Sequence, residues 1–270
     1  GSRTRRRWAA LASKATRPTR SSRPSRPGRP SWRDRAFVVR TYDFGEADRV
    51  VVLLTRSHGL VRGVAKGVRK ARSRFGSRLQ PFVDLDVQIY PGKGLSTITA
   101  ADTVAYHGAR IIEDFERYAA ACAILEAADK LAYEEADPEL FDLVKDGIRQ
   151  LQTTEAPTQV LDAFILRATD HAGWGLSLYN CANCEKPGPH RAFNAAVGGA
   201  VCTNCRPSGS MTVAEETLHA MWLLARGYEY TPDSATGEST VESQVHRAAT
   251  AHLQYHLESG LKSLRMMEQA

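Results

Sequence analysis

The sequence predicts a multi-domain α+β protein in which a small antiparallel β-barrel precedes an α-helical domain. Short apolar runs of strand type fill the chain up to about residue 106, and apolar residues then recur at helical spacing. Two Cys-x-x-Cys pairs interrupt the helical part. The chain has 270 residues, of which 43% are hydrophobic, so it can bury a substantial core. No apolar run reaches the ~18 residues that a membrane-spanning helix needs.

The first 31 residues have a composition of their own. They hold ten Lys or Arg and no acidic residue, and between residues 17 and 30 the chain alternates Arg, Pro, Ser and Gly. Such a composition cannot bury a core. We therefore expect residues 1–31 to be a disordered basic arm, followed by a barrel domain at 32–106 and a helical domain at 107–270.

Five short strands are predicted in the barrel domain. The first three are β-branched runs separated by turn residues, at 36–39, 50–54 and 60–65. Residues 83–90 alternate strictly between apolar and polar, as in a half-buried strand. Pro91-Gly92-Lys93-Gly94 then turns the chain into a fifth strand around residues 95–103. Five antiparallel strands in so short a span are typical of a closed barrel of the OB type, with an SH3-like barrel as the alternative.

Helical spacing begins after Gly108. The residues predicted on one face of a first helix are Phe115, Tyr118, Cys122, Leu125 and Leu131. Asp137-Pro138 opens a second helix, with the inward residues Leu140, Phe141, Val144, Ile148 and Leu151. A third helix is supplied by Val160, Leu161, Phe164, Ile165 and Ala168. Thr212 and Glu215 form a capping box ahead of a fourth helix, and a last one runs from about residue 241 to 256.

Four of the five cysteines form two close pairs. Cys181 and Cys184 make one Cys-x-x-Cys motif, Cys202 and Cys205 make the other, and 17 residues separate them. Each turn places two sulfurs on one side, so four thiolates can surround one tetrahedral ion. The sequence therefore predicts a zinc knuckle at residues 181–205 with one structural zinc per chain, in a reducing compartment. Cys122 stands alone on a helix face and is expected in the core.

Other candidate sites are weaker. His190 lies between the cysteine pairs in a Pro/Gly turn and is interpreted as a bystander. His252 and His256 are four residues apart on the last helix but lack a third ligand, so we expect a plain polar face. No phosphate-binding loop, metalloprotease motif or nucleophile elbow occurs. No catalytic residue is predicted, and we expect a protein that is not an enzyme; a Cys-x-x-Cys redox protein is the enzymatic alternative.

Positive charge is concentrated near the N-terminus. Residues 32–78 hold twelve basic and four acidic residues, and from residue 79 onward the net charge is −12, because the whole chain sums to +6. Seven basic residues fall within 17 positions that contain no acid: Arg62, Lys66, Arg69, Lys70, Arg72, Arg74 and Arg78. Long basic side chains on a glycine-containing loop can follow a phosphate backbone without reading its sequence. These seven residues are the predicted DNA-binding residues.

Four aromatic residues lie near this basic stretch in the sequence: Tyr42, Phe75, Phe82 and Tyr90. Their rings can offer faces to unstacked bases, each worth about 1–3 kcal/mol. Aromatic side chains in a small barrel also fill its interior, and for these four we favour the interior.

Taken in order, several motifs resemble the bacterial RecO family of recombination mediators. They occupy residues 34–39, 45–49, 54–56, 58–59, 64–69 and 79–82 in the barrel. Further along come the Cys-x-x-Cys pairs, with Gly198-Gly199 before Cys202, and then residues 261–264. The resemblance covers roughly residues 33–266 and leaves the N-terminal arm outside.

The resemblance implies an OB-fold followed by a helical domain with a zinc knuckle. It implies a DNA repair and homologous recombination protein of the RecF pathway that binds single- and double-stranded DNA, anneals complementary strands and assists recombinase loading on coated single strands. The implied partners are the single-stranded DNA-binding protein, through its acidic C-terminal tail, and RecR, at a cytoplasmic, nucleoid-associated location with no membrane. The alternative is an OB-fold RNA-binding or translation-associated protein with a structural zinc ribbon.

Overall fold

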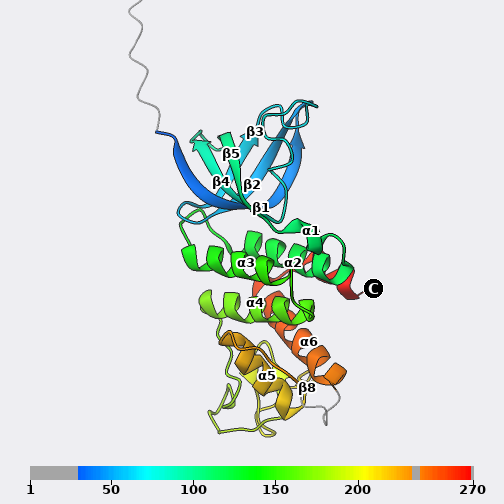
Figure 1. The fold of residues 1–270 in the computed structure, drawn as a ribbon. Coiled ribbons are helices and arrows are strands. Elements are labelled where there is room, and N and C mark those ends of the chain that lie inside the picture. The colour runs from blue at the N-terminus through cyan, green and yellow to red at the C-terminus, as the bar shows by residue number, and fades with distance from the viewer. Residues whose placement is uncertain (1–29, 233–237, 269–270) are drawn as a thin grey trace, which may run out of the picture. The chain divides into compact units, whose positions relative to one another are not determined.

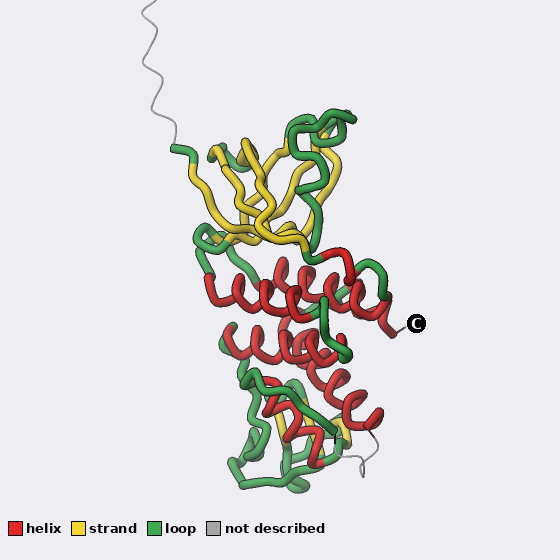
Figure 2. The backbone as a smooth tube through the Cα atoms, viewed as in Figure 1, coloured by secondary structure: helices red, strands yellow, loops and turns green. Residues whose placement is uncertain are grey.

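The barrel in the computed structural model, which describes residues 30–232 and 238–268, has five strands. They are β1 (Trp32–Phe44), β2 (Asp48–Thr55), β3 (Gly59–Ala65), β4 (Val83–Tyr90) and β5 (Ser96–Tyr106). They close in the order β1-β2-β3-β5-β4, with every pairing antiparallel except β3–β5 (Figures 1 and 2). The predicted five-stranded barrel is therefore confirmed. The predicted arm, apart from Pro30 and Ser31, lies outside the described residues.

Side chains that alternate along the strands fill the barrel. The interior cluster includes Val51 of β2, Ile89 of β4 and Ile98 of β5, none of which is exposed. Gly63 of β3 faces Ile98, where a Cβ would lie only 2.6 Å from the isoleucine Cγ1. The glycine therefore lets β3 approach β5 closely enough to close the barrel.

Seven helices and a small sheet follow in the described part of the chain. The helices are α1 (Gly108–Ile111), α2 (Phe115–Leu131), α3 (Pro138–Gln150), α4 (Pro157–His171), α5 (Glu215–Ala225), α6 (Glu238–Leu257) and α7 (Lys262–Glu268). The sheet contains β6 (Ala192–Asn194), β7 (Gly199–Ala200) and β8 (Met211–Thr212) in the order β7-β6-β8. Asp137 caps α3 by accepting from the Leu140 N–H, with Pro138 in the first turn. None of these described helices is both long and apolar enough to span a bilayer.

The structure corrects the predicted start of α5 and the predicted buried face of α2. Thr212 does not cap α5, because it lies in β8, where it pairs with Ala192 and its hydroxyl accepts from Arg206. The N-cap is Ala214, whose backbone N–H donates to Gln244 Oε1 on α6. On α2, Phe115 and Tyr118 are 50% and 39% exposed rather than inward, because alanines, Ile124 and leucines fill the buried side of this helix.

The barrel and the helices share one hydrophobic cluster. Phe37 and Leu54, on the outer side of the barrel, belong to the same buried cluster as the helical core. The Phe37 ring centroid lies 5.5 Å from that of Phe141 on α3. Ion pairs flank this contact at Arg40–Asp129 and Arg56–Asp142, both at 3.0 Å. The described residues from Ser31 onward form one compact unit, so the division into domains at residue 106 stays a prediction.

Gly59, at the start of β3, lies directly against the loop between α2 and α3. Its φ is +67°, and a Cβ there would stand 2.2 Å from the Glu135 carbonyl oxygen. The next residue, Leu60, donates its N–H to the Tyr133 carbonyl at 2.7 Å. Only glycine combines this left-handed backbone with such a close approach.

We expect Gly59→Ala to lower the free energy of unfolding by at least about 3 kcal/mol, because it adds a backbone clash to the left-handed penalty. Gly45→Ala is the matched control: Gly45 also has a left-handed φ, of +63°, but nothing lies within 4 Å of its added Cβ. It should cost about 1 kcal/mol. Urea titration of both variants measures the difference, and equal losses would mean that the contact with the loop contributes nothing.

Candidate nucleic-acid interface and metal centre

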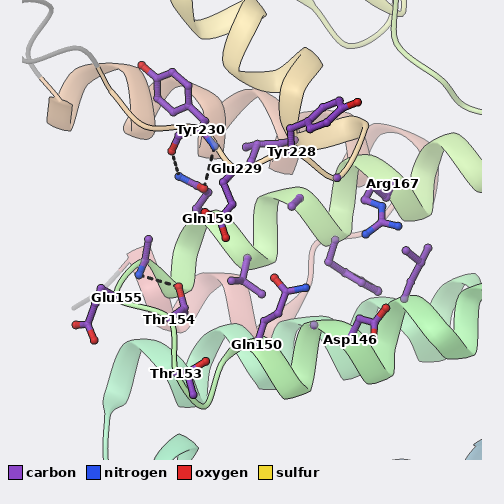
Figure 3. A pocket seen from close by; sticks show the side chains of 18 residues that line it. Asp146, Gln150, Thr153, Thr154, Glu155, Gln159, Arg167, Tyr228, Glu229 and Tyr230 are labelled. Atoms are coloured by element: carbon purple, nitrogen blue, oxygen red, sulfur yellow. Dashed lines mark hydrogen bonds between the residues drawn. The ribbon is translucent and has the colours of Figure 1, made fainter.

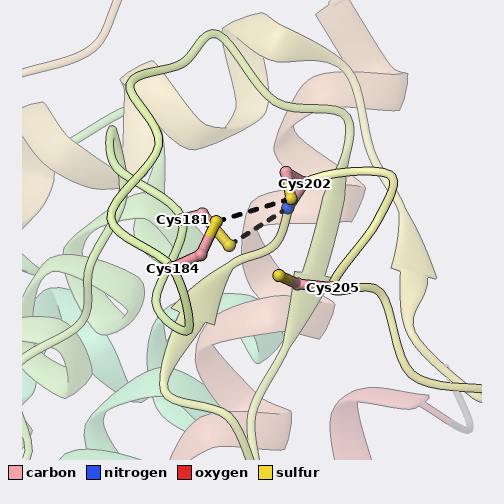
Figure 4. A group of neighbouring side chains, drawn as sticks. All are labelled: Cys181, Cys184, Cys202 and Cys205. Atoms are coloured by element: carbon pink, nitrogen blue, oxygen red, sulfur yellow. Dashed lines mark hydrogen bonds between the residues drawn. The ribbon is translucent and has the colours of Figure 1, made fainter.

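The four paired cysteines meet at one place in the structure. Cys181 and Cys184 lie in the turn before β6, and Cys202 and Cys205 lie in the turn after β7 (Figure 4). The four Sγ atoms all lie within 4.8 Å of one another, and Cys184 Sγ is 3.8 Å from Cys202 Sγ. A tetrahedral ion with metal–sulfur bonds of about 2.3 Å needs sulfurs about 3.8 Å apart. The cluster therefore fits one tetrahedral metal ion.

Backbone hydrogen bonds shape the two turns that carry these cysteines. The Cys181 N–H donates to the Lys186 carbonyl, and the Glu185 N–H donates back to the Cys181 carbonyl, both at 2.9 Å. In the second turn the Cys205 N–H donates to the Cys202 carbonyl at 3.1 Å. Gly199 in β7 allows Ser177 to pack on the knuckle, since a Cβ would stand 2.0 Å from the Ser177 carbonyl oxygen. The spacing of the cysteines and the close approach at Gly199 thus place the two cysteine-bearing turns side by side.

Backbone N–H groups favour thiolates in part of this cluster. The Cys202 N–H donates to Cys181 Sγ at 3.4 Å, and this bond leads the effects that lower the pKa of Cys181 to about 6. At Cys184 the Lys186 N–H favours the thiolate, but hydrogen bonds with Cys205 and Cys181, together with burial, prevail and raise the pKa to about 11. A bound cation removes this conflict, because it stabilises all four thiolates at once.

A closed set of four protein ligands leaves no position for a reacting water. A metal ion held in this way can brace the fold but cannot activate a substrate.

His190 stays outside the cluster: it is buried, and its Nε2 lies 2.9 Å from the Lys186 carbonyl oxygen. Cys122 packs partly buried against the helical core, and burial raises the pKa of its thiol. The structure thus gathers the four predicted ligands and no others among the residues it describes.

His252 and His256 do not form the plain polar face predicted for the last helix. His252 is 1% exposed and its Nε2 lies 2.8 Å from the Trp174 carbonyl oxygen. His256 stacks on the Trp174 ring with centroids 4.5 Å apart. Burial lowers the pKa of His252 to about 4, against the effect of its hydrogen bond to Trp174. The pair packs α6 against the segment after α4, a tertiary contact that helical periodicity does not reveal.

We call residues 62–78 the basic segment. It begins on the outer side of β3 and continues as the connection to β4. Phe75 and Leu79, only 1% and 4% exposed, insert into the barrel core. Arg74 and Arg78 donate to the Ile98 and Ala101 carbonyls of β5, each at 3.4 Å. The segment therefore lies along β5, and its seven basic side chains are all exposed.

The basic residues of this segment differ in how they are paired. Arg69 reaches Asp43 at 3.5 Å and the Gly45 carbonyl at 3.4 Å, both in the β1–β2 hairpin. No ion pair or side-chain hydrogen bond within the described part of the chain involves the remaining four: Arg62, Lys66, Lys70 and Arg72. In contrast, every arginine of the barrel outside the basic segment forms an ion pair with a carboxylate. These arginines are Arg33, Arg35, Arg40, Arg49 and Arg56. Positive charge without a carboxylate partner is thus concentrated in the basic segment of the barrel.

The four aromatic residues near the segment separate into two groups. Phe75 is 1% exposed and lies in the barrel interior, as predicted. Phe82 is 5% exposed but is buried in the cluster shared with the helices, with its ring edge-on to that of Tyr118 on α2 at a centroid distance of 5.9 Å. Tyr42 and Tyr90 are not in the interior, because they are 43% and 48% exposed. The sequence analysis also missed Phe44, which is 48% exposed in the hairpin that contacts Arg69. The alternation over residues 83–90 already places Tyr90 on the polar side of its strand. Tyr42 and Phe44 could be assigned only with the register of β1, which contains a bulge.

The helical part contains a cavity of about 460 Å³ between α3, α4 and the chain after α5 (Figure 3). Its labelled lining includes the carboxylates of Asp146, Glu155 and Glu229, with Arg167 as the only cation among the lining residues. Gln159 closes one side by donating to and accepting from the backbone of Tyr230 at 2.9 and 3.3 Å. The cavity is therefore acidic on balance.

Protein-family models match both parts of the chain. Residues 30–107 match Recombination protein O N terminal, and residues 112–265 match Recombination protein O C terminal. The chain belongs to the RecO family. The first RecO match ends one residue beyond β5, and the second covers most of the helices and the cysteine cluster. Membership of the RecO family gives the chain a role in DNA repair and recombination.

We expect Cys184→Ser and Cys205→Ser to lose the bound ion, because three thiolates and a hydroxyl hold a soft cation poorly. Metal analysis of the purified protein should fall from about one ion per chain to near zero, with a lower melting temperature. Cys122→Ser is the control, since Cys122 lies outside the cluster. A native protein without metal, or metal loss in the control alone, would contradict the assignment.

We expect acidification to destabilise the folded chain through His252. Its pKa lies below the ordinary 6.5 in the folded state, so the unfolded chain binds the proton first as the pH falls. The contribution of neutral His252 to the free energy of unfolding is therefore complete above pH 6.5. It is lost as the pH falls toward 4, and the loss reaches about 2 kcal/mol at pH 5. His252→Gln keeps a donor for Trp174 but does not titrate. Denaturant titrations at pH 7 and pH 5 measure how far the free energy of unfolding falls between the two pH values. The fall should be smaller in this variant, and an unchanged fall would exclude His252 as its source.

Proposed function

We propose that this RecO-family protein is a non-catalytic mediator of the RecF pathway. In this role it binds single- and double-stranded DNA, anneals complementary strands and assists recombinase loading on single strands coated by single-stranded DNA-binding protein. The observation that carries the proposal is the basic segment, whose four unpaired cations are displayed from a barrel that is otherwise internally charge-balanced. Such cations replace the counterions condensed on a phosphate backbone.

The placement of the basic segment supports binding without sequence preference. Its cations project from a connection and from the outer side of β3, where a strand can be followed along its backbone. No groove-reading helix is part of the segment, so base-specific contacts are not its chemistry. Neutralising the phosphates of two strands together reduces their mutual repulsion, which is the physical basis that we propose for annealing.

We infer that the ion held by the four cysteines is zinc. Four thiolates in tetrahedral arrangement are the usual set for structural zinc in a reducing compartment. The knuckle has only a small apolar cluster of its own, built around Cys181, Ala192, Val201 and Cys202. Zinc would hold the two turns together and supply no chemistry to a substrate.

The proposed protein partners are RecR and the acidic C-terminal tail of the single-stranded DNA-binding protein, as the family resemblance implies. The helical cavity between α3 and α4 does not suit that tail, because three carboxylates and one guanidinium line it. An acidic peptide would meet repulsion there. Charge therefore favours another surface for the tail.

The decisive experiment removes charge without removing structural contacts. We expect the variant Arg62→Gln, Lys66→Gln, Lys70→Gln and Arg72→Gln to fold normally, because none of these side chains has an ion pair or hydrogen bond within the described chain. If the four contact phosphates, the slope of log affinity against log salt for single strands should become less negative by about 2.8. Annealing of complementary oligonucleotides should slow in parallel.

A charge-matched control separates this effect from net charge alone. It neutralises four exposed basic residues of the helical part that have no ion pair or side-chain hydrogen bond among the described residues: Arg110, Arg247, Lys262 and Arg265. This control should anneal like the unmodified protein. If both variants anneal normally, the basic segment is not the DNA surface, and stronger binding of structured RNA than of single-stranded DNA would favour an RNA-binding role instead.

A further inference from the structure

Strand pairing places two exposed tyrosines in one row around the barrel. Tyr42 of β1 is opposite Val50 of β2, which is opposite Val64 of β3. Val64 in turn pairs with Thr97 of β5, and Thr97 pairs with Tyr90 of β4. By this pairing the row crosses all five strands. At about 4.8 Å per strand, its two ends are about 19 Å apart along the surface.

The row lies on the outer side of the barrel. Its immediate neighbours along the strands point inward, since Val51, Ile89 and Ile98 all belong to the interior cluster. Successive side chains of a strand point to opposite faces. Tyr42 and Tyr90 must therefore point outward, in agreement with their exposures of 43% and 48%. Between them the row consists of shorter side chains that their neighbours cover: Val50 and Val64 are 0% and 8% exposed, and Thr97 is partly buried.

Cations flank the middle of this row. Arg62, two residues before Val64 on β3, lies on the same side of the strand as the row, and Lys66 follows in the turn directly after β3. Both are exposed, and in the part of the chain that the structure describes neither has an ion pair or a side-chain hydrogen bond. Tyr42 and Tyr90 likewise have no ring partner there. Two free rings at the ends and two free cations at the centre match a base–phosphate polymer.

The hairpin that carries Tyr42 is fixed to the basic segment. The Arg69 N–H donates to the Ala47 carbonyl at 3.0 Å, and its guanidinium reaches Asp43. The Gly67 N–H donates to Asp48 Oδ1 at 2.7 Å. The backbone that carries Tyr42 and the backbone of the basic segment therefore keep a fixed relation, which lowers the entropic cost of ordering them on a ligand.

We propose that Tyr42 and Tyr90 are base-stacking residues, and that a single DNA strand crosses the barrel along this row with its phosphates at Arg62 and Lys66. The inference rests on the proposed function and adds to it the residues that distinguish single from double strands. A duplex keeps its bases stacked on one another and offers only phosphates to the cations. An exposed aromatic side chain is common by itself; the row, the flanking cations and the absence of other partners together make the argument.

The test uses the full, metal-replete chain and two oligonucleotides of about 12 nucleotides, within the usual site size of an OB-fold. One carries all its bases, and the other is abasic in the middle but has the same phosphates. Tyr42→Ala and Tyr90→Ala should each weaken binding of the base-containing strand about tenfold. Their binding of the abasic strand should match that of the unmodified protein.

Two further variants serve as controls. Tyr42→Phe should retain affinity, because the ring and not the hydroxyl stacks on the base. Tyr133→Ala removes a tyrosine that is 72% exposed in the loop after α2, and it should bind both strands normally. Unchanged affinity in Tyr42→Ala and Tyr90→Ala, or an equal loss on both strands, would overturn the inference while leaving the basic segment as the DNA surface. Failure of the unmodified protein to bind either strand would instead overturn the proposed function.

Discussion

The short parallel contact between β3 and β5 is the constraint on which the rest of the barrel depends. Only Gly63–Ser96 and Val64–Thr97 pair there, so most of β5 has no strand on that side. The basic segment lies along it, donating Arg74 and Arg78 to β5 carbonyls and inserting Phe75 into the core. Because the apolar residues of the segment are held inside, its lysines and remaining arginines are forced outward. The same interaction thus closes the barrel and displays the charge.

The division between paired and unpaired cations follows from this arrangement. Arginines on β1 and β2 lie on regular strands whose neighbours carry carboxylates, as Arg33 does with Asp86 and Asp102. Exposed pairs of this kind contribute little stability, about 0–1 kcal/mol each, but they cancel local charge. The basic segment contains no acid, so apart from Arg69 its cations repel one another with no compensating carboxylate. A polyanion would relieve this repulsion, so the charge of the segment favours binding of such a ligand over stability of the free fold.

Much of the fold could be predicted from the sequence because its signals are local. Alternation over residues 83–90 predicts β4, Asp137-Pro138 predicts the start of α3, and the two Cys-x-x-Cys pairs predict the four-cysteine cluster. The errors concern residues whose surroundings are set by distant segments. Thr212 and Glu215 have the spacing of a capping box, yet Thr212 pairs with a strand about twenty residues earlier. His252 has the pattern of a surface residue, yet Trp174 from the segment after α4 covers it.

The candidate site shows the same division. The composition of the basic segment identifies it without any structure, but the different roles of Arg72 and Arg74 depend on where β5 lies. Likewise Tyr42 and Phe75 are indistinguishable as aromatic residues near basic ones. Only the bulge in β1 and the closure of the barrel decide that the first points to solvent and the second into the core.

The shared cluster around Phe37, Leu54 and Phe141 has a consequence for dissecting this molecule. A fragment ending after β5 would uncover apolar side chains that the helices now shield, and such a patch promotes self-association. A fragment containing only the helices would likewise expose the apolar side chains that the barrel now covers. Barrel and bundle are therefore expected to unfold as one cooperative unit, and a ligand that binds only the folded barrel would stabilise the helical half as well through this common core.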